Sequence, residues 1–317
     1  MFESVLEAIR ETDTVILHRH SNPDGDALGS QIGLACLIRD NFPGKTVYTV
    51  GDDAKRYAFM DGSVMDDIPD SAYEGALAII LDSATSELVS DKRFSLAAKT
   101  ARIDHHIYCE TFTDLEIVDT SFESCCGMIA ELAREQNLRL SPASATAIFT
   151  GMVTDSGRFR YDSTSARTFR LAAFLMEQPI DTAELYRNLY SDELSSVIRR
   201  ATFLQKIKRF EDSSVAYLYN TAEEIAALGM DVFSVSRGMV NTMADIRGID
   251  IWVNFTEADG KVLCELRSSR YNINPIAVKY GGGGHKKASG ADVADYAEAM
   301  RMLADLKALT EGSDEQH

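Results

Sequence analysis

The chain has 317 residues, 45% of them hydrophobic and 26% charged, and its formal net charge at pH 7 is −17. This length predicts two domains, and the composition is typical of a folded globular protein. The charge repels phosphate polymers at long range, which excludes a protein that holds long nucleic acid on a basic surface. The longest apolar run, at 76–81, is too short for a bilayer, for which about 18 residues are needed.

The N-terminal segment, 1–13, has apolar residues at helical intervals. It carries acids where a secretion signal carries bases, so we expect a cytoplasmic protein with no membrane partner. The five cysteines include no C-x-x-C spacing, which favours reduced thiols in packing positions over a disulfide framework or a structural zinc site. The adjacent Cys125 and Cys126 are interpreted in the same way, and the sequence assigns them no function.

Short apolar runs alternate with helical patterns from residue 13 to about 155. Strands are predicted at 14–18, 46–51, 77–82 and 101–104, and helices at 27–39, 123–135 and 143–153. This alternation predicts an α/β domain with a mostly parallel sheet and helices on both faces.

The second half of the chain has a different pattern. Helical patterns fill 165–210, a strand is predicted at 214–219, and two β-patterned runs within 250–269 are joined by Asp259-Gly260, a strong hairpin signal. A glycine-rich run at 279–290 precedes a final helix from about 295. We predict a catalytic domain over 1–190, a helical connector over 191–212 and a smaller α/β domain over 213–317.

Acids and histidines follow several of the predicted strands. His20, Asp24 and Asp26 have the spacing H-x-x-x-D-x-D, and the glycine between the two acids lets both carboxylates face one point. Taken alone, Asp26 or Ser30 would serve equally well to cap the helix that follows. The other acids and histidines of this kind are Asp82, Asp104, His105, His106 and Asp155. Because ligand sites lie beyond the carboxyl ends of parallel strands, these side chains should converge.

Carboxylates and imidazoles together suit manganese, iron or zinc better than calcium. So many carboxylates in one place would repel one another unless cations neutralise them, and two metal ions are the simplest solution. A pair of ions about 3.5–4 Å apart is the usual apparatus for in-line displacement at phosphorus. The leading hypothesis is therefore phosphoester hydrolysis.

The ordered segments "HSNPDGDALGS", "LDSA", "DHH" and "TDSGRF" resemble the successive motifs of the DHH phosphoesterase superfamily. "ELRSS" and "GGGGHKKASG" resemble motifs of its associated C-terminal domain. The chain looks most like the subfamily of bifunctional nanoRNA-degrading enzymes that also act as 3′-phosphoadenosine 5′-phosphate phosphatases.

The resemblance implies two divalent ions, for which we expect manganese. One would be held by His20, Asp24 and Asp82, and the second by Asp26, Asp82, His105 and Asp155, so that Asp82 bridges them. His106 would face the scissile phosphate, and Asp104 would orient the histidine pair. His18 alternates with His20 along the strand, so it should point to the opposite face and be structural.

The C-terminal domain is expected to bind the nucleotide. Backbone N–H groups of the glycine run can approach a phosphate closely, and His285 with Lys286 or Lys287 adds positive charge. A guanidinium at the end of the hairpin can hold a phosphate bidentately. The predicted substrate-binding residues are Arg267, Ser268, Ser269, Gly282, Gly283, Gly284 and His285. A flexible loop and a simple surface charge are the structural alternatives, and Arg158, Arg160 and Tyr161 either reach the substrate or stay solvated.

We expect an active site between the domains that hydrolyses short RNA, dinucleotides and adenine nucleotides rather than long duplexes. Metal-activated water would release 5′-mononucleotides from oligonucleotides, and AMP from 3′-phosphoadenosine 5′-phosphate. A phosphodiesterase for cyclic-di-AMP or linear pApA would use the same residues. A manganese pyrophosphatase would lack the glycine-histidine run, and a catalytically silent nucleotide sensor would not need every ligand position filled. The resemblance alone implies a homodimer.

Overall fold

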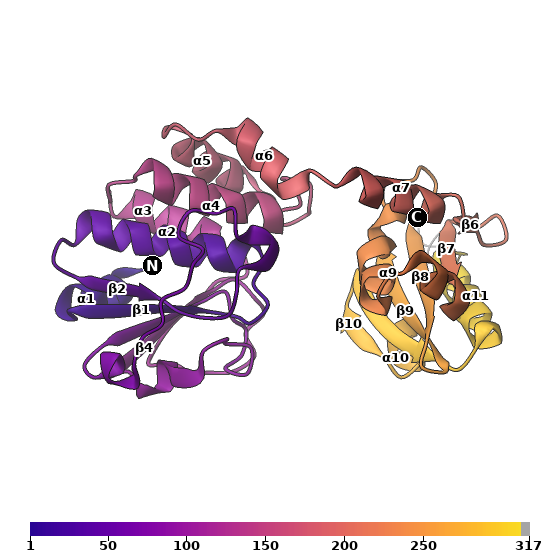
Figure 1. The fold of residues 1–317 in the computed structure, drawn as a ribbon, viewed down its shortest axis with the longest axis horizontal. Coiled ribbons are helices and arrows are strands. Elements are labelled where there is room, and N and C mark those ends of the chain that lie inside the picture. The colour runs from indigo at the N-terminus through magenta and orange to yellow at the C-terminus, as the bar shows by residue number, and fades with distance from the viewer. Residues whose placement is uncertain (312–317) are drawn as a thin grey trace. The chain divides into compact units, whose positions relative to one another are not determined.

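The computed structural model describes residues 1–311 and divides the chain into two compact units, Met1–Ser191 and a second that begins at Asp192 (Figure 1). The end of the predicted second domain, 312–317, lies outside the described residues. Each unit has its own apolar core. None of the helices within 1–311 has an apolar stretch of the length that a membrane span requires.

The first unit contains a five-stranded sheet in which every neighbouring pair is parallel. In spatial order its strands are β2 (Thr46–Thr49), β1 (Thr14–Arg19), β3 (Leu77–Leu81), β4 (Lys99–Asp104) and β5 (Leu115–Val118). The sequence predicted four of these strands. It missed β5, because that strand has four residues and only one of them is buried.

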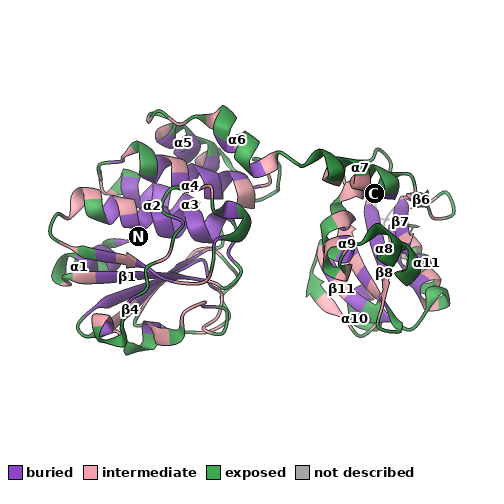
Figure 2. Cartoon of the chain, in the orientation of Figure 1, coloured by how far each residue is buried: buried purple, intermediate pink, exposed green. Residues whose placement is uncertain are grey.

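The period of two along the strands sends alternate residues to the two faces of the sheet. Val15 and Leu17 join the main core, whereas Ile16 packs on the other face. The helices of this unit are α1 (Glu3–Glu11), α2 (Gly25–Asn41), α3 (Cys125–Glu135), α4 (Pro142–Asp155), α5 (Ala166–Leu175) and α6 (Thr182–Tyr190). Helices α2, α3 and α4 are the most buried (Figure 2). Two 3₁₀-helices, Asp70–Tyr73 and Lys92–Leu96, cover the other face.

The second unit contains a mixed six-stranded sheet. In spatial order its strands are β10 (Gly283–His285), β11 (Ala288–Val293), β9 (Lys261–Ser268), β8 (Ile251–Ala258), β7 (Val215–Asn220) and β6 (Lys208–Arg209). Strands β8 and β9 form the predicted hairpin, with Asp259 and Gly260 both at positive φ in the turn. The helices are α7 (Leu194–Leu204), α8 (Ala222–Leu228), α9 (Val232–Met239), α10 (Asn274–Lys279) and α11 (Tyr296–Glu311). The predicted fold, a parallel α/β domain followed by a smaller α/β domain, is confirmed.

Candidate functional site

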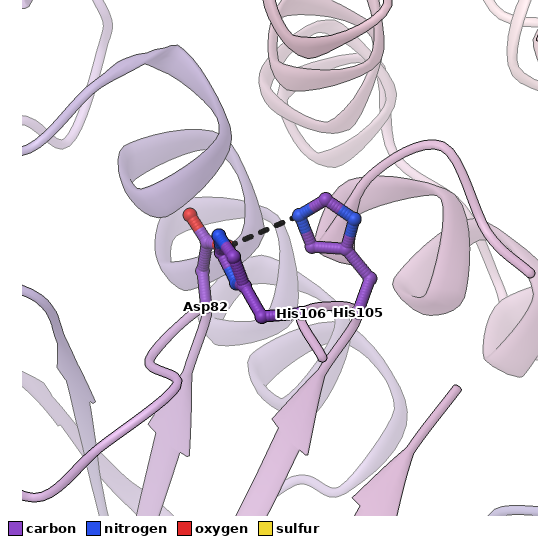
Figure 3. A group of neighbouring side chains, drawn as sticks. All are labelled: Asp82, His105 and His106. Atoms are coloured by element: carbon purple, nitrogen blue, oxygen red, sulfur yellow. Dashed lines mark ion pairs between the residues drawn. The ribbon is translucent and has the colours of Figure 1, made fainter. Parts of the chain in front are cut away.

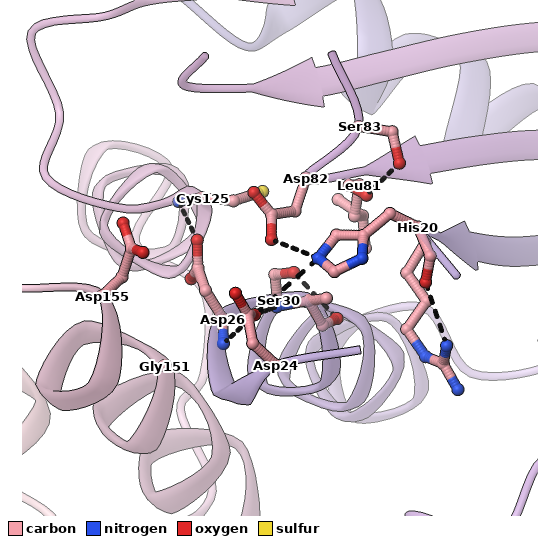
Figure 4. Close-up of polar contacts among 12 residues, drawn as sticks. His20, Asp24, Asp26, Ser30, Leu81, Asp82, Ser83, Cys125, Gly151 and Asp155 are labelled. Atoms are coloured by element: carbon pink, nitrogen blue, oxygen red, sulfur yellow. Dashed lines mark hydrogen bonds and ion pairs between the residues drawn. The ribbon is translucent and has the colours of Figure 1, made fainter. Parts of the chain in front are cut away.

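Acids and histidines from four segments of the first unit meet at the carboxyl end of its sheet. Figure 4 shows His20, Asp24, Asp26, Asp82 and Asp155 of this cluster. His20 follows β1, Asp82 follows β3, His105 follows β4, and Asp155 is the last residue of α4. A carboxylate at the end of a helix faces the negative pole of the helix dipole, so Asp155 is not placed there to stabilise α4. This is the convergence that the sequence pattern predicted.

His20, Asp24 and Asp82 form one group. The His20 Nε2 atom lies 3.8 Å from Asp24 Oδ1 and 3.5 Å from Asp82 Oδ2, and its Nδ1 lies 2.8 Å from the Ser21 carbonyl oxygen. A carbonyl only accepts, so Nδ1 carries a hydrogen, and Nε2 is the nitrogen that faces the two carboxylates. Asp24 also caps α2, since its Oδ1 accepts from the backbone N–H groups of Asp26 and Ala27. The helix cap is therefore Asp24 and not Asp26 or Ser30.

A second group surrounds His105. Its Nε2 atom lies 3.7 Å from Asp26 Oδ2, 3.5 Å from Asp82 Oδ1 and 3.5 Å from Asp155 Oδ2. In this group of three aspartates and one imidazole, Asp82 is shared with His20. The ligand atoms of Asp26, His105 and Asp155 all lie within 4.8 Å of one another, as do those of His20, Asp24 and Asp82.

Asp82 lies between the two groups and contacts both histidines of the pair that follows β4 (Figure 3). It is only 2% exposed, and its Oδ1 has no hydrogen-bond partner within residues 1–311. Its backbone is in the left-handed region, with φ of 52°, an unfavourable conformation for an aspartate that the surrounding structure must enforce. A buried carboxylate oxygen held in this way is suited to a metal ion.

Asp26 is held by backbone groups whose position no sequence pattern indicated. Its Oδ2 and Oδ1 accept from the N–H groups of Cys125 and Cys126, at 2.7 and 2.8 Å, at the N-terminus of α3. A Cβ at Gly151 would lie 2.2 Å from Cys126 Sγ and 2.9 Å from Asp26 Cα. Both cysteines are buried free thiols, so they act here as small packing residues that let α3 approach Asp26.

The charges of the cluster perturb one another strongly. Burial alone would lower the pKa values of His20 and His105, but the surrounding aspartates raise them to about 11 and about 10. Burial, together with Asp82 and Asp24, raises the pKa of Asp155 to about 7. Without cations, protons on His20 and His105, and on Asp155 below about neutral pH, therefore compensate the negative charge of the cluster. Divalent ions would supply the same compensating charge, so the donor set fits them.

His106 is oriented differently from His105. Its Nδ1 lies 2.8 Å from Asp104 Oδ1, and that hydrogen bond is the main cause that raises the pKa of His106. Because Asp104 accepts from Nδ1, the Nε2 atom of this half-exposed side chain is left for another partner. The structure thus separates the pair: His105 faces three aspartates, and His106 is positioned by Asp104.

Arg102 is a buried residue beside the site that sequence reasoning missed. Its guanidinium donates to the carbonyl oxygens of Ala84, at 3.0 Å, and Glu110, at 3.2 Å, and pairs with the Glu116 carboxylate. It thereby joins the loop after Asp82 to the loop after His106. The available signal was an arginine between Ala101 and Ile103, two apolar residues of the predicted strand.

The second unit contains an open cavity of about 1020 Å³. Arg267, His285 and Gly281 to Gly284 line it, and Phe233, Ser236 and Arg237 of α9, which the sequence did not single out, join them. Arg237 and Arg267 both pair with Glu265, at 3.0 and 3.2 Å. The glycine run is not a loop throughout, because Gly283–His285 forms β10.

The two predicted serines lie elsewhere. The Ser268 hydroxyl accepts from the backbone N–H groups of Arg270 and Tyr271, and the Ser269 hydroxyl contacts the Asp250 carbonyl oxygen at 3.3 Å. Neither serine is among the described residues that line the cavity. Both hold the chain turn that follows β9.

A parallel α/β unit with a carboxylate and imidazole cluster at its carboxyl edge, followed by a second unit with an open cavity, is the architecture of a phosphoesterase, a hydrolase. Residues 14–152 match the DHH family N-terminal domain, and residues 232–312 match the DHHA1 domain. The chain belongs to the DHH family.

Its relatives include the bifunctional oligoribonuclease and PAP phosphatase NrnA of Bacillus subtilis, which is 36% identical over 98% of each chain. The cyclic-di-AMP phosphodiesterase GdpP of Geobacillus thermodenitrificans is 27% identical over 94% of this chain and 47% of its own length. An exopolyphosphatase-related protein from Bacteroides fragilis has the same fold, with a TM-score of 0.84 at 24% identity over 98% of this chain and 97% of its own.

Proposed function

We propose that the chain hydrolyses short oligoribonucleotides to 5′-mononucleotides and 3′-phosphoadenosine 5′-phosphate to AMP, with two manganese ions. The observation that carries the proposal is the pair of carboxylate and imidazole groups that share Asp82. Support for the substrates comes from the NrnA relatives, which match along nearly the whole chain.

His20, Asp24 and Asp82 would hold one ion, and Asp26, Asp82, His105 and Asp155 the other. Mixed carboxylate and imidazole donors suit manganese. When bound, a pair of ions supplies activation of water and stabilisation of charge on the phosphoryl oxygens. Asp26 is fixed for this task by the N-terminus of α3, and His20 by the carbonyl oxygen of Ser21.

The remaining chemistry falls to groups of the chain itself. We assign to His106 Nε2 a hydrogen bond to an oxygen of the scissile phosphate, with Asp104 holding the ring from the opposite nitrogen. A positively charged imidazole there stabilises the negative charge that develops during displacement. The cavity of the second unit, with Arg237, Arg267 and the glycine run, would bind the nucleoside part of the substrate.

The charge of −17 favours short substrates, because a long polymer would meet repulsion outside the local site. The match to GdpP favours a second candidate, hydrolysis of cyclic-di-AMP or linear pApA by the same residues. The two candidates differ in substrate and not in the catalytic cluster.

The test is release of mononucleotides in manganese from a short RNA, 3′-phosphoadenosine 5′-phosphate, pApA and cyclic-di-AMP. We expect the first two to be turned over and Asp82→Ala to abolish activity, whereas Asp67→Ala, at an exposed aspartate of the same unit, should keep it. A marked preference for cyclic-di-AMP would select the second candidate. No turnover of any substrate by folded, manganese-loaded protein would overturn both.

A further inference from the structure

Basic side chains lie on segments that adjoin residues of the acidic cluster. Lys55 Nζ donates to Asn22 Oδ1, and Asn22 lies between the candidate ligands His20 and Asp24. Arg158 follows Asp155 by three residues, on the loop that leaves α4. The last turn of α4, from which this loop leaves, packs on the start of α2, since a Cβ at Gly25 would meet the side chain of Thr154. Lys55 and Arg158 thus flank the cluster from two different segments.

Arg56 and Arg158 approach the same turn at the end of α6. The Arg158 guanidinium carbon lies 4.5 Å from the centre of the Tyr190 ring, and an Arg56 Nη atom lies 3.5 Å from the Leu189 carbonyl oxygen. Arg56 also lies over the ring of Tyr57, at 4.9 Å. Stacking on tyrosine restrains each guanidinium and leaves its N–H edge available.

The backbone around Arg158 is held in an unusual conformation. Gly157, Arg158 and Phe159 all have φ near +60°, at 57°, 63° and 61°. For two residues with a Cβ this costs free energy, and it persists because the Arg158 N–H donates to the Val153 carbonyl oxygen and the Phe159 ring packs on Phe149. The surrounding structure therefore fixes the direction in which Arg158 leaves the helix.

The guanidiniums of Arg56 and Arg158 form no ion pairs with acidic side chains of the described residues. Arg56 and Arg158 are exposed, and within residues 1–311 neither has a carboxylate within ion-pair distance. The two fully buried arginines of the same unit behave differently, because Arg19 pairs with Asp52 and Arg102 with Glu116. In a chain with 49 acids and 32 Lys and Arg residues, two unpaired guanidiniums beside the cluster are available to an anion.

We propose, on the basis of the function proposed above, that Arg56 and Arg158, assisted by Lys55, form a second phosphate subsite in the catalytic unit. Its occupant is the 5′-phosphate of the nucleoside whose 3′ oxygen carries the scissile phosphate. Linear pApA and 3′-phosphoadenosine 5′-phosphate both have such a group, one nucleoside away from the bond that is broken. One subsite would therefore serve both activities, and guanidinium forks suit a terminal phosphate.

The test compares kcat/KM for pApA with that for ApA, which lacks the 5′-phosphate. We expect the wild type to prefer pApA, and Arg158→Ala and Arg56→Ala each to reduce this preference about tenfold, the effect of losing one charge-assisted hydrogen bond. Arg158→Lys should restore part of it, because the charge is kept and the fork is lost. Arg170→Ala, at an exposed arginine of α5, is the matched control and should keep the wild-type preference.

A binding experiment separates this proposal from the proposed function. Calorimetry with dinucleotide analogues that have a methylene-bridged, non-hydrolysable linkage, with and without a 5′-phosphate, needs no turnover. One outcome is that the wild type hydrolyses no substrate and yet binds the phosphorylated analogue more tightly than the unphosphorylated one, while Arg158→Ala binds the two equally. That result would support the subsite and refute the proposed enzymatic function. Equal binding of the two analogues by the wild type, or an equal loss in Arg170→Ala, would overturn the subsite.

Discussion

Replacement of His18 by glutamine should remove a large part of the acid sensitivity of the first unit. His18 is fully buried on the face of the sheet away from the cluster, against the rings of Tyr73 and Phe94. Its Nε2 lies 3.4 Å from the Tyr73 hydroxyl. Burial lowers the pKa of His18 from 6.5 to about 4, although Asp91 opposes the shift.

The direction of this pH effect follows from the linkage between proton binding and folding. As the pH falls below 6.5, the unfolded chain binds a proton at this position and the folded chain does not, so the folded state loses stability until the pH reaches about 4. A shift of this size corresponds to about 3 kcal/mol in total, of which about 2 kcal/mol is lost between about pH 7.5 and pH 5. Above about pH 6.5 the His18 side chain is mainly neutral in both the folded and the unfolded state, so its titration no longer lowers the stability of the fold.

The assay is urea unfolding of metal-free wild type and His18→Gln, followed by circular dichroism across that range of pH. The unfolding free energy of the wild type minus that of His18→Gln should fall by about 2 kcal/mol between about pH 7.5 and pH 5. Titration of the other groups is common to both proteins and cancels in this difference. A difference that stays constant with pH would show that burial does not lower the pKa of His18 in the folded state.

Three further changes test the site. Gly151→Ala should destabilise the first unit by about 1–3 kcal/mol and weaken manganese binding, because the new Cβ displaces Cys126 and Asp26; urea unfolding and metal titration measure both effects. Arg102→Met should cost about 3–5 kcal/mol, because it leaves the Glu116 carboxylate unpaired, and Glu116→Gln in the same protein should recover part of that loss in urea. Removal of manganese with a chelator should lower the melting temperature of the wild type, because it removes about 2.7 kcal/mol of stabilisation for each site held at a hundredfold excess over its Kd, and it should have much less effect on Asp82→Ala.

The acids and histidines of the cluster could be predicted because parallel strands end at one edge of a sheet. A side chain that directly follows a strand, such as Asp82 or His105, needs only the strand assignment to be placed. The support of Asp26 could not be predicted in this way. It comes from backbone N–H groups of α3, about 100 residues further along the chain, and backbone groups have no sequence signature.

The second unit was harder to predict for a related reason. Arg267 and the glycine run were found because their residue types suggest phosphate binding, but the contribution of α9 to the cavity depends on how that helix packs on the sheet. Ser268 was assigned to substrate by its neighbours in the motif, whereas its hydroxyl holds the turn after β9. A hydroxyl that serves the backbone cannot be distinguished from one that serves a ligand by its position in the sequence.

The charge of the cluster gives the unpaired arginines a reason to be where they are. Asp24, Asp26, Asp82 and Asp155 carry four negative charges when ionised, and two divalent ions carry four positive ones, so the loaded centre would attract a phosphate only over a short range. The rest of the chain is strongly acidic. Positive charge that acts on the substrate must then come from the chain beside the metals, and in the proposed mechanism His106 would supply it at the scissile phosphate. A substrate with a further phosphate needs positive charge at a second place, and the proposed source is Arg56 and Arg158, whose exposed guanidiniums are each restrained over a tyrosine ring.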